Sequence, residues 1–290
     1  MRKCLGLVVL AALVAGQAAA REDEKLKPMP LPMNTEDDDD EPHVAEGGLL
    51  FLFTRVKGGK EVLLAARRKV ASGAWPKKAI DEGDFDYVAK KGDVRGVFAT
   101  AGTHPRYLYF AAKDKLGKNY DLFVAVQQDT RKAWTAPTFL IKGNTDEDEA
   151  HPSLSADGKS LYFSRRTKEG WQQMVMTRAA AKGPQGWREP EEVGLPVGFH
   201  HAAVTPDGKT MYLQGPLDKE RWGLFFAQRK GKGWDKPVPL DKLNDAEGKV
   251  GDKSPSLSRD GKVLYFSSDR PGGKGGLDLY AITREKLGTK

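Results

Sequence analysis

Hydrophobic and polar positions alternate in short runs along the chain, and one arrangement of them recurs. An Asp-Gly-Lys segment joins two such runs, and the second run carries Leu or Met, then Tyr, then Phe or Leu. The three closest copies are residues 155–163, 205–213 and 258–266. Glycine accepts the positive φ that a two-residue turn requires, so this pattern predicts a β-hairpin at each copy.

Weaker copies extend the repeat to five units. The residue that ends each Tyr-containing run serves as a marker: Phe53, Phe110, Phe163, Leu213 and Phe266. Successive markers lie 50 to 57 residues apart. After each marker come a loop and a further apolar run, and four units then continue with a Trp and a nearby Pro, starting at Trp75, Trp134, Trp187 and Trp234.

Each unit therefore predicts four strands, of which the Trp-Pro segment is the outermost because Pro in a sheet belongs at an edge. A four-stranded sheet repeated at this period is typical of a propeller blade. We expect an all-β fold, a five-bladed β-propeller of four-stranded antiparallel blades. Blade two departs from the pattern, since residues 100–107 replace its short turn and residues 81–96 have no counterpart in the other units.

The fifth unit ends at Lys290 without a Trp strand. The N-terminal segment can supply it, because residues 34–53 align without a gap with residues 144–163. Residues 28–33 would then be the outer strand of the last blade and would close the ring. The alternative is that residues 21–43, which include the acidic run NTEDDDDE, form a disordered tail.

The first twenty residues have the pattern of a secretory signal peptide. Arg2 and Lys3 precede an apolar run over residues 5–15, and small residues end at Ala20. We expect a short tail over residues 21–27, a single propeller domain over residues 28–290, and a periplasmic or secreted protein. The apolar run is too short to span a membrane, so no transmembrane segment is expected in the mature chain.

The single cysteine, Cys4, lies within this leader. The mature chain is then free of disulfides and thiolate metal sites, and about 270 residues suffice to hold an all-β domain by its core alone. Its net charge would be +5, from 45 basic and 40 acidic residues. The basic residues are interleaved with acidic ones, so we expect no nucleic-acid partner.

The repeats resemble the WD40-like (PD40-type, TolB-like) β-propeller repeat family. Residues 255–270 carry the likeness best, with Pro-Ser-Leu-Ser-Arg-Asp-Gly-Lys-Val-Leu-Tyr-Phe-Ser-Ser-Asp-Arg, and residues 152–165 follow. The resemblance implies a propeller fold. It leaves function open, because such propellers serve as protein-binding scaffolds, carbohydrate-processing domains and peptidase gates.

Recognisable catalytic motifs are absent from the sequence. It holds no Gly-x-Ser-x-Gly elbow and no His-Glu-x-x-His helix, and Gly272–Gly276 joins two predicted strands rather than a strand and a helix. We therefore expect no cofactor and no metal.

Polar residues nevertheless cluster where each innermost strand begins, and in a propeller these positions line one mouth of the central channel. The candidate ligand-binding residues are Glu41, Asp148, Glu149, His151, His200, His201, Asp252 and Ser254. Converging carboxylates and imidazoles can bind a polar ligand such as a sugar, or supply an acid and a base. The alternative is a structural role, in which the acidic residue near each Pro accepts backbone hydrogen bonds.

The sequence favours a non-enzymatic binding module that recognises a cell-envelope protein or polysaccharide. The alternative is a carbohydrate-active enzyme, either a glycoside hydrolase or a lyase, with central carboxylates drawn from Glu41, Glu149 and Asp252. That reading requires two of them to face each other across roughly 5–10 Å. Trp171 and Trp222 are candidates for a sugar-stacking or protein-contact surface. A purely structural domain is the third reading.

Overall fold

The structure is a computed structural model that describes residues 26–30, 32–78, 93–100, 105–113, 119–129, 133–180, 183–244 and 247–288. The expected signal peptide and most of the segment without a counterpart at residues 81–96 lie outside these ranges. No helix in the described ranges has the length and apolar character needed to cross a membrane.

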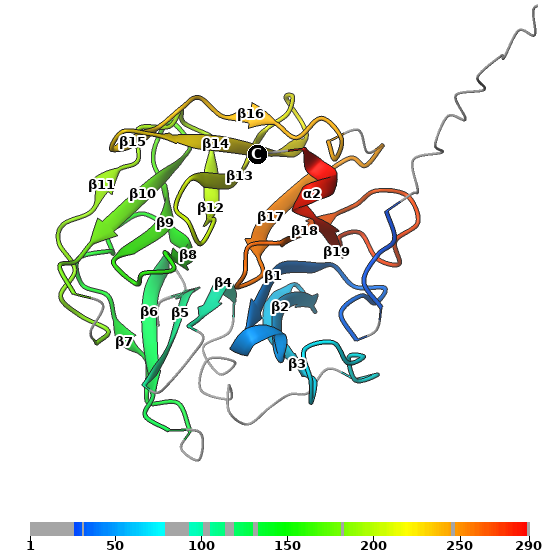
Figure 1. Cartoon of the computed structure of the whole chain (residues 1–290), viewed down its shortest axis with the longest axis horizontal. Helices are drawn as coiled ribbons and strands as arrows, with labels where there is room; N and C mark the ends of the chain where they lie inside the picture. The colour runs from blue at the N-terminus through cyan, green and yellow to red at the C-terminus, as the bar shows by residue number, and fades with distance from the viewer. Residues whose placement is uncertain are drawn as a thin grey trace, which may run out of the picture.

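Five antiparallel sheets stand around a central axis, as predicted (Figure 1). The expected four strands occur in blades two and three, whereas among the described residues blades one and five have three and blade four has five. Blade one is β1 (Asp39–Ala45), β2 (Leu50–Lys57) and β3 (Lys60–Arg67). Blade two is β4 (Val94–Ala99), β5 (Arg106–Lys113), β6 (Tyr120–Gln127) and β7 (Thr138–Phe139). Blade three is β8 (Glu149–Leu154), β9 (Ser160–Arg166), β10 (Trp171–Thr177) and β11 (Glu191–Glu192). Blade four is β12 (His200–Val204), β13 (Thr210–Pro216), β14 (Trp222–Lys230), β15 (Gly233–Trp234) and β16 (Val238–Pro239). Blade five is β17 (Asp252–Leu257), β18 (Val263–Ser268) and β19 (Asp278–Thr283).

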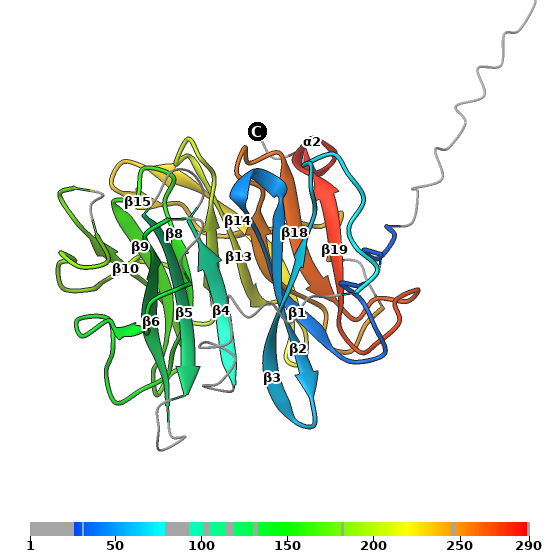
Figure 2. The same ribbon diagram turned by 90° about the horizontal axis from the view of Figure 1, so that it is seen from below.

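The first strand of each blade lies nearest the axis, and the strands run along that axis (Figure 2). Helical structure is confined to the short 3-10 turn η1 (Glu46–Gly48) and the single turn α2 (Arg284–Leu287) within the described residues. All five innermost strands run in the same direction, so their first residues meet at one end of the axis and their last residues at the other.

The N-terminal segment closes the ring, which confirms the prediction. Pro28 forms an antiparallel bridge with Tyr280 on β19, and the Met29 N–H donates to the Leu279 carbonyl at 2.8 Å. Asn34 then donates to the Leu279 carbonyl and accepts from its N–H, at 2.9 and 2.7 Å. The acidic run is therefore part of the propeller rather than a disordered tail.

The same asparagine contact occurs twice more, where the chain leaves an outer strand. Asn144 holds the N–H and carbonyl of Leu122 at 2.7 and 3.0 Å. Asn244 does so for Leu224, with both distances 2.8 Å. We call these three residues the asparagine clamps. They explain the gap-free alignment, because residues 34–53 and 144–163 repeat a hydrogen-bonding pattern as well as a spacing.

The recurrent Trp residues mark the outer edge of the blades. Trp75, Trp187 and Trp234 each stack against an Arg guanidinium from the end of the third strand, with Cζ 4.1 to 4.2 Å from the ring centroid. The outer strands themselves are two residues long, in keeping with the prolines near them.

The hydrophobic core is divided among the interfaces between blades. Five buried clusters fill the interfaces one–two, two–three, three–four, four–five and five–one. The fifth–first interface includes Met29 and Met33 from the closing segment. Each blade thus buries both faces against its neighbours, and the central axis is left to the residues of the innermost strands.

Candidate functional site

A bulge in every innermost strand turns one residue toward the axis. In each blade the pairing of the first and second strands shifts by one residue. The residue at this shift has φ between 53° and 56°, and the five are Glu41, Gly96, His151, His201 and Ser254. Four of them are not glycine, although this region of φ is disfavoured for other residues. Four of the five therefore carry side chains that meet at the middle of the ring.

Hydrogen bonds from the neighbouring blade satisfy the bulged amides. Gly96 N–H donates to Glu41 Oε2 at 2.5 Å. His201 N–H donates to Ser164 Oγ at 3.0 Å, and Ser254 N–H donates to Gln214 Oε1 at 2.9 Å. Because buried backbone donors need partners, these contacts fix the bulge residues as well as the packing between blades.

Glu41 and two histidines form a chain across the axis. Glu41 Oε1 lies 3.2 Å from His151 Nε2, and the His151 ring stacks on that of His201 with centroids 4.1 Å apart. On its other side, His151 Nδ1 contacts Ser164 Oγ at 3.2 Å. The three side chains are all more than nine-tenths buried.

Burial sets the charge of these groups. Burial, with the neighbouring Asp40 carboxylate adding to it, raises the pKa of Glu41 to about 7. Burial and the positive charges of Arg95 and Lys253 lower the pKa of His151 to about 3. Burial also holds the pKa of His201 well below its usual value. At neutral pH the imidazoles are neutral, and Glu41 is the group poised to exchange a proton.

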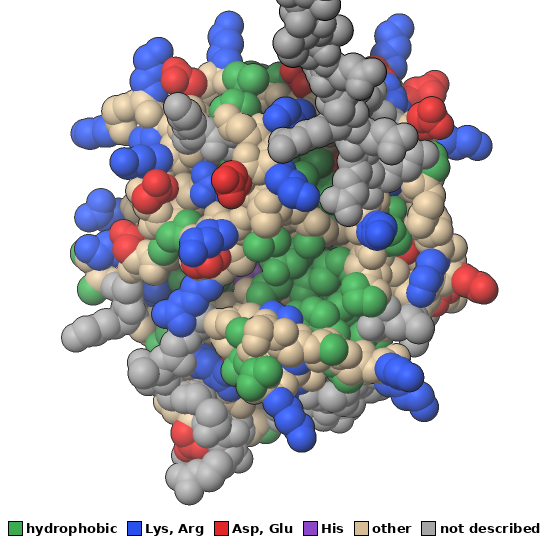
Figure 3. Space-filling view, turned by 45° about the vertical axis from the view of Figure 1, so that its right-hand side comes forward, with side chains coloured by type: hydrophobic (Ala, Val, Ile, Leu, Met, Phe, Trp, Pro, Cys, Tyr) green, Lys and Arg blue, Asp and Glu red, His purple; other side chains and the backbone are tan. Residues whose placement is uncertain are grey.

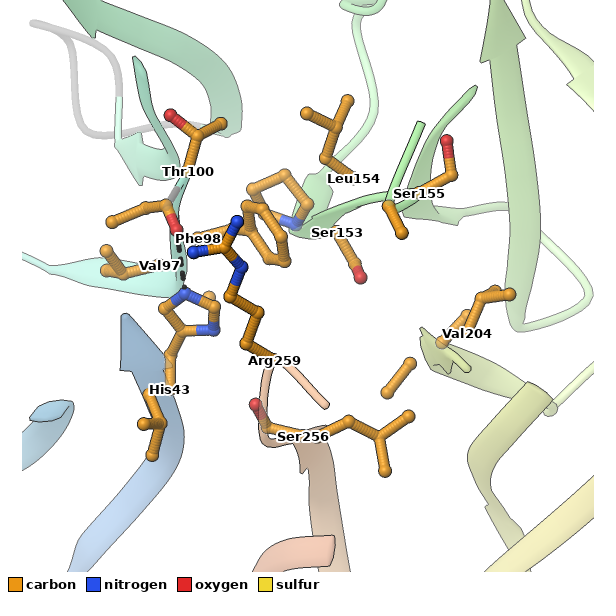
Figure 4. A pocket seen from close by; sticks show the side chains of 18 of the residues that line it. His43, Val97, Phe98, Thr100, Ser153, Leu154, Ser155, Val204, Ser256 and Arg259 are labelled. Atoms are coloured by element: carbon orange, nitrogen blue, oxygen red, sulfur yellow. Dashed lines mark hydrogen bonds between the residues drawn. The ribbon is translucent and has the colours of Figure 1, made fainter. Parts of the chain in front are cut away.

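A pocket of about 560 Å³ opens on the axis next to the row formed by Glu41, His151 and His201 (Figure 4). Its walls come from the last residues of the five innermost strands, and Glu41 and His201 are among the residues that line it. Apolar side chains such as Val97, Phe98 and Leu154 alternate with Ser153 and Ser256. The pocket therefore lies at the end of the axis opposite the mouth that we expected from the sequence.

The structure places hydrophobic side chains near the middle of the face in Figure 3, with lysines and arginines projecting around it. Such a mixture of apolar walls and a few polar groups, within 300–1,000 Å³, is typical of small-molecule pockets.

One polar atom of a residue that lines the pocket lacks a partner: Nδ1 of His201 is buried and has no hydrogen-bond partner among the described residues. Buried polar groups are normally hydrogen-bonded, so this nitrogen is an exception within the ring of innermost strands.

Three of the predicted site residues are held by contacts within the fold, Glu149 and Asp252 inside their own blades and Asp148 across to blade two. Glu149 pairs with Arg165 and Asp252 with Arg270, each at 2.7 Å, and Glu149 also accepts from the Thr145 N–H at 3.0 Å. Asp148 accepts from the Tyr120 N–H at 2.9 Å. Asp39 repeats the pattern in blade one, with Arg55 at 2.6 Å. These carboxylates anchor the start of the innermost strand. Glu149 and Asp252 are held by arginines and do not line the pocket that Glu41 lines, so the facing pair of carboxylates expected for an enzyme is not formed by these three residues.

His200 lies beside the two tryptophans that the sequence singled out. Its ring stacks on Trp171 and meets Trp222 edge-on, with centroids 5.3 Å away in both cases. Its nitrogens contact the Gly198 carbonyl at 2.9 Å and Gln214 Nε2 at 2.9 Å. Burial, followed by His151, lowers the pKa of His200 to about 3. Trp171 and Trp222 are half-buried, so this group acts chiefly as packing around the axis.

Charged residues that the sequence did not single out surround Glu41. Asp40 pairs with Lys253 at 3.0 Å and accepts from Ser267. Burial opposes ionisation of Asp40, but Lys253 and the two neighbouring serines outweigh it and lower its pKa. Glu61, paired with Arg95 at 2.8 Å, has its pKa raised by burial and by Glu41.

No three His, Cys, Asp or Glu side chains of the described residues are placed to hold a metal ion. The histidine rings pack on one another, and nitrogens of His151 and His200 contact other residues. Their lone pairs therefore do not point toward one common metal position.

No protein-family model matches the sequence, and no curated protein matches it. Solved structures do match. A thermostable family-43 glycoside hydrolase aligns over 88% of this chain and 92% of its own, with TM-score 0.57 and 12% identity. The α-L-arabinofuranosidase of Podospora anserina, solved with cellotriose, aligns over 89% and 94% (TM-score 0.55, 13% identity). The Bacillus subtilis arabinanase aligns over 86% and 95% (TM-score 0.57, 12% identity). The fold is shared.

These matches correct two expectations. The five-bladed propeller is confirmed, but the matching structures are glycoside hydrolase propellers rather than WD40-like, PD40-type or TolB-like repeats. The expectation of a non-enzymatic binding module is wrong, because the structures that match nearly the whole chain are those of carbohydrate-cleaving enzymes. The sequence favoured a binding module because it lacks the helix-based nucleophile elbow and the metal-binding helix, neither of which a propeller needs.

Proposed function

We propose that the protein is a carbohydrate-active enzyme that cleaves glycosidic bonds in the central pocket, with Glu41 as the proton-transferring group. The observation that carries this proposal is the Glu41 carboxyl at a pocket on the axis, with a pKa raised to about 7. The likeness of fold to glycoside hydrolases supports it.

A carboxyl group with a pKa near the working pH suits general acid catalysis. Glu41 gives its proton to the leaving oxygen as the glycosidic C–O bond breaks, and a water molecule adds to the anomeric carbon. The proton that this water releases returns to the Glu41 carboxylate, which restores the acid. Asp40, the residue before Glu41, stays ionised and helps to keep Glu41 protonated. His151 Nε2 fixes the orientation of the Glu41 carboxyl from 3.2 Å.

Glu41→Gln tests the proposal, because the amide keeps the shape of the side chain and cannot donate a proton in the same way. We expect cleavage of the best polysaccharide, found by release of reducing ends across a panel of neutral and acidic glycans, to fall at least ~100-fold. Glu192→Gln, on the exposed strand β11, is the matched control and should keep full activity. Cleavage by Glu41→Gln at the wild-type rate, or no cleavage of any panel member by the wild-type protein, would contradict the proposal.

The pH profile provides a second test. The acid must be protonated, so kcat/KM should fall as the pH rises through about 7, the pKa of Glu41 in the free protein. Initial rates between pH 5 and pH 9 measure this limb. A basic limb that begins only above pH 9 would exclude Glu41 as the acid.

We also propose that the protein acts outside the cytoplasm on an envelope or extracellular polysaccharide, on the basis of the leader-like residues 1–20. N-terminal sequencing of the exported protein should begin at Arg21, and retention of the leader in the cytoplasmic fraction would contradict this location.

A further inference from the structure

The three Asp-Gly turns around the pocket are built alike but differ at one position. In each, a Ser or Thr side chain donates to the turn Asp, at 2.6 to 2.7 Å. The residue between them also lines the pocket, and it is Ala156 in blade three, Pro206 in blade four and Arg259 in blade five. The turn does not require a charge at this position, and Arg259 is the one of these three residues that brings a cation to the rim of the pocket.

The Arg259 side chain extends into the pocket. Figure 4 shows it reaching from the end of β17 toward the wall that carries His43 and Phe98. Its guanidinium forms no hydrogen bond or ion pair with any described residue. The neighbouring Asp260 is already held by Ser258 and by the Lys262 N–H, at 2.7 and 3.1 Å.

The other lining arginine is occupied, and its charge is not neutralised by a carboxylate. Arg178 donates to the carbonyls of Gly158 and Gly183 and stacks on Trp187. The pocket also contains two acidic side chains. Glu41 is mostly protonated below its raised pKa of about 7, and Asp157 is tied into its turn by Ser155 and the Lys159 N–H. In a mildly acidic solution the two lining arginines therefore face a single charged carboxylate, that of Asp157, and the pocket carries an excess of positive charge.

We propose that Arg259 selects a carboxylate-bearing sugar, so that the glycan bound in the pocket is a polyuronate. A guanidinium binds a carboxylate through two parallel N–H donors, which gives both orientation and strength. This inference rests on the proposed function, since it assigns the substrate class of the same pocket. It makes Arg259 a specificity-determining residue, while Glu41 remains the proton donor.

Paired probes isolate the carboxylate. Galacturonate, mannuronate and glucuronate oligomers are titrated into the mature protein by calorimetry at pH 6, each beside its neutral methyl ester. We expect at least one free acid to bind ~10-fold or more tightly than its ester, as one charge-assisted hydrogen bond would give. Arg259→Ala, which copies the turn of blade three, should reduce binding of the acid to the level of the ester.

Arg188→Ala, on an exposed outer segment, is the control and should leave both affinities unchanged. Equal binding of acid and ester, binding of neither, or an unaffected Arg259→Ala variant would overturn the proposal. Dextran sulfate that binds as tightly as the uronates and depends equally on Arg259 would also overturn it, by showing a general anion site.

The two proposals fail separately. If Glu41→Gln cleaves normally while Arg259 still discriminates acid from ester, the assignment of Glu41 is wrong and the assignment of Arg259 stands. If Glu41→Gln is inactive and Arg259→Ala discriminates as the wild type does, the reverse holds.

Discussion

At the scale of single residues, the site depends on a backbone conformation that most residues avoid. The bulge residues of all five blades share a φ near +55°, and a non-glycine residue there costs about 1 kcal/mol. The surrounding blades stabilise this strain through hydrogen bonds to the bulged amides. Gly96 occupies the position in blade two because a larger residue would collide with the neighbouring strand: a Cβ there would lie 2.4 Å from His151 Cα.

Gly96→Ala tests this steric reason. We expect a loss of unfolding free energy of about 3 kcal/mol, from strain at positive φ together with overpacking against backbone. Gly58→Ala is the control, since Gly58 has the same φ of +56° and open space around it; it should cost only about 1 kcal/mol. Urea denaturation measures both, and equal losses would show that the collision with His151 is relieved at no cost.

At the scale of elements, the asparagine clamps decide whether a segment joins the propeller. A two-residue outer strand offers few backbone hydrogen bonds, and the closing segment offers a single bridge at Pro28. A side-chain amide that hydrogen-bonds both the N–H and the carbonyl of one residue takes the place of the backbone hydrogen bonds that a longer strand would make. Asn34 adds a bond to the Met29 carbonyl at 2.9 Å, which fixes the turn that leads into β1.

Asn34→Ala should therefore loosen the ring at its closure. Three hydrogen bonds within a buried region are lost, so the unfolding free energy should fall by about 2 to 4 kcal/mol. The Leu279 amide should lose protection against hydrogen exchange. Asn119→Ala, which removes one exposed bond to the Asp146 carbonyl, should cost less than about 1 kcal/mol. Similar effects of the two substitutions would show that the clamp does not hold the closing segment.

At the scale of the whole molecule, the ring brings buried titratable groups from every blade onto one axis. Burial keeps His43, His151, His200 and His201 neutral in the folded state. A histidine whose folded pKa lies below its unfolded pKa takes up a proton on unfolding at any pH between the two. The stability of the fold therefore declines as the pH falls from the unfolded pKa toward the folded pKa, and this decline ends below the folded pKa.

His43 gives a clean measurement of this effect. Burial lowers its pKa from 6.5 to about 4, and its Nε2 donates to the Ala99 carbonyl at 3.2 Å. The stability lost between pH 7 and pH 5 should be about 2 kcal/mol greater in the wild type than in His43→Gln, which keeps a donor and cannot titrate. Urea unfolding at both pH values measures the difference, and an unchanged pH dependence would show that His43 is protonated in the folded protein.

The repeat alone was enough to predict five blades and the closing segment. Asp-Gly turns fix where hairpins form, and residues 34–53 match residues 144–163 because both must make the same clamp. The outer strands were harder to place: they are only two residues long, so a Trp-Pro segment shows their position and not their extent. The acidic residue beside the Pro was correctly suspected of a structural role, as the ion pairs of Glu149 and Asp252 show.

The sequence also identified most of the residues that lie on the axis. Glu41, His151 and Ser254 each precede a Pro at the bulge of an innermost strand. It placed the pocket at the wrong end, because the direction in which a bulged side chain points depends on φ and not on its position in the repeat. Arg259 was passed over for a related reason: within the turn motif it is an ordinary variable position.

The sequence by itself determined the number of blades, their hairpins and the way the chain closes, because these follow from local turn chemistry and from alternation repeated at a fixed period. Only the tertiary structure decided which carboxyl could act. Glu149 and Glu41 are both glutamates near a Pro, and burial raises the pKa of both. Thr145 and Arg165 oppose this rise at Glu149, whereas the Asp40 carboxylate adds to it at Glu41. The charge state depends on burial and on which charged side chains the fold brings close, and the repeat pattern does not contain that information.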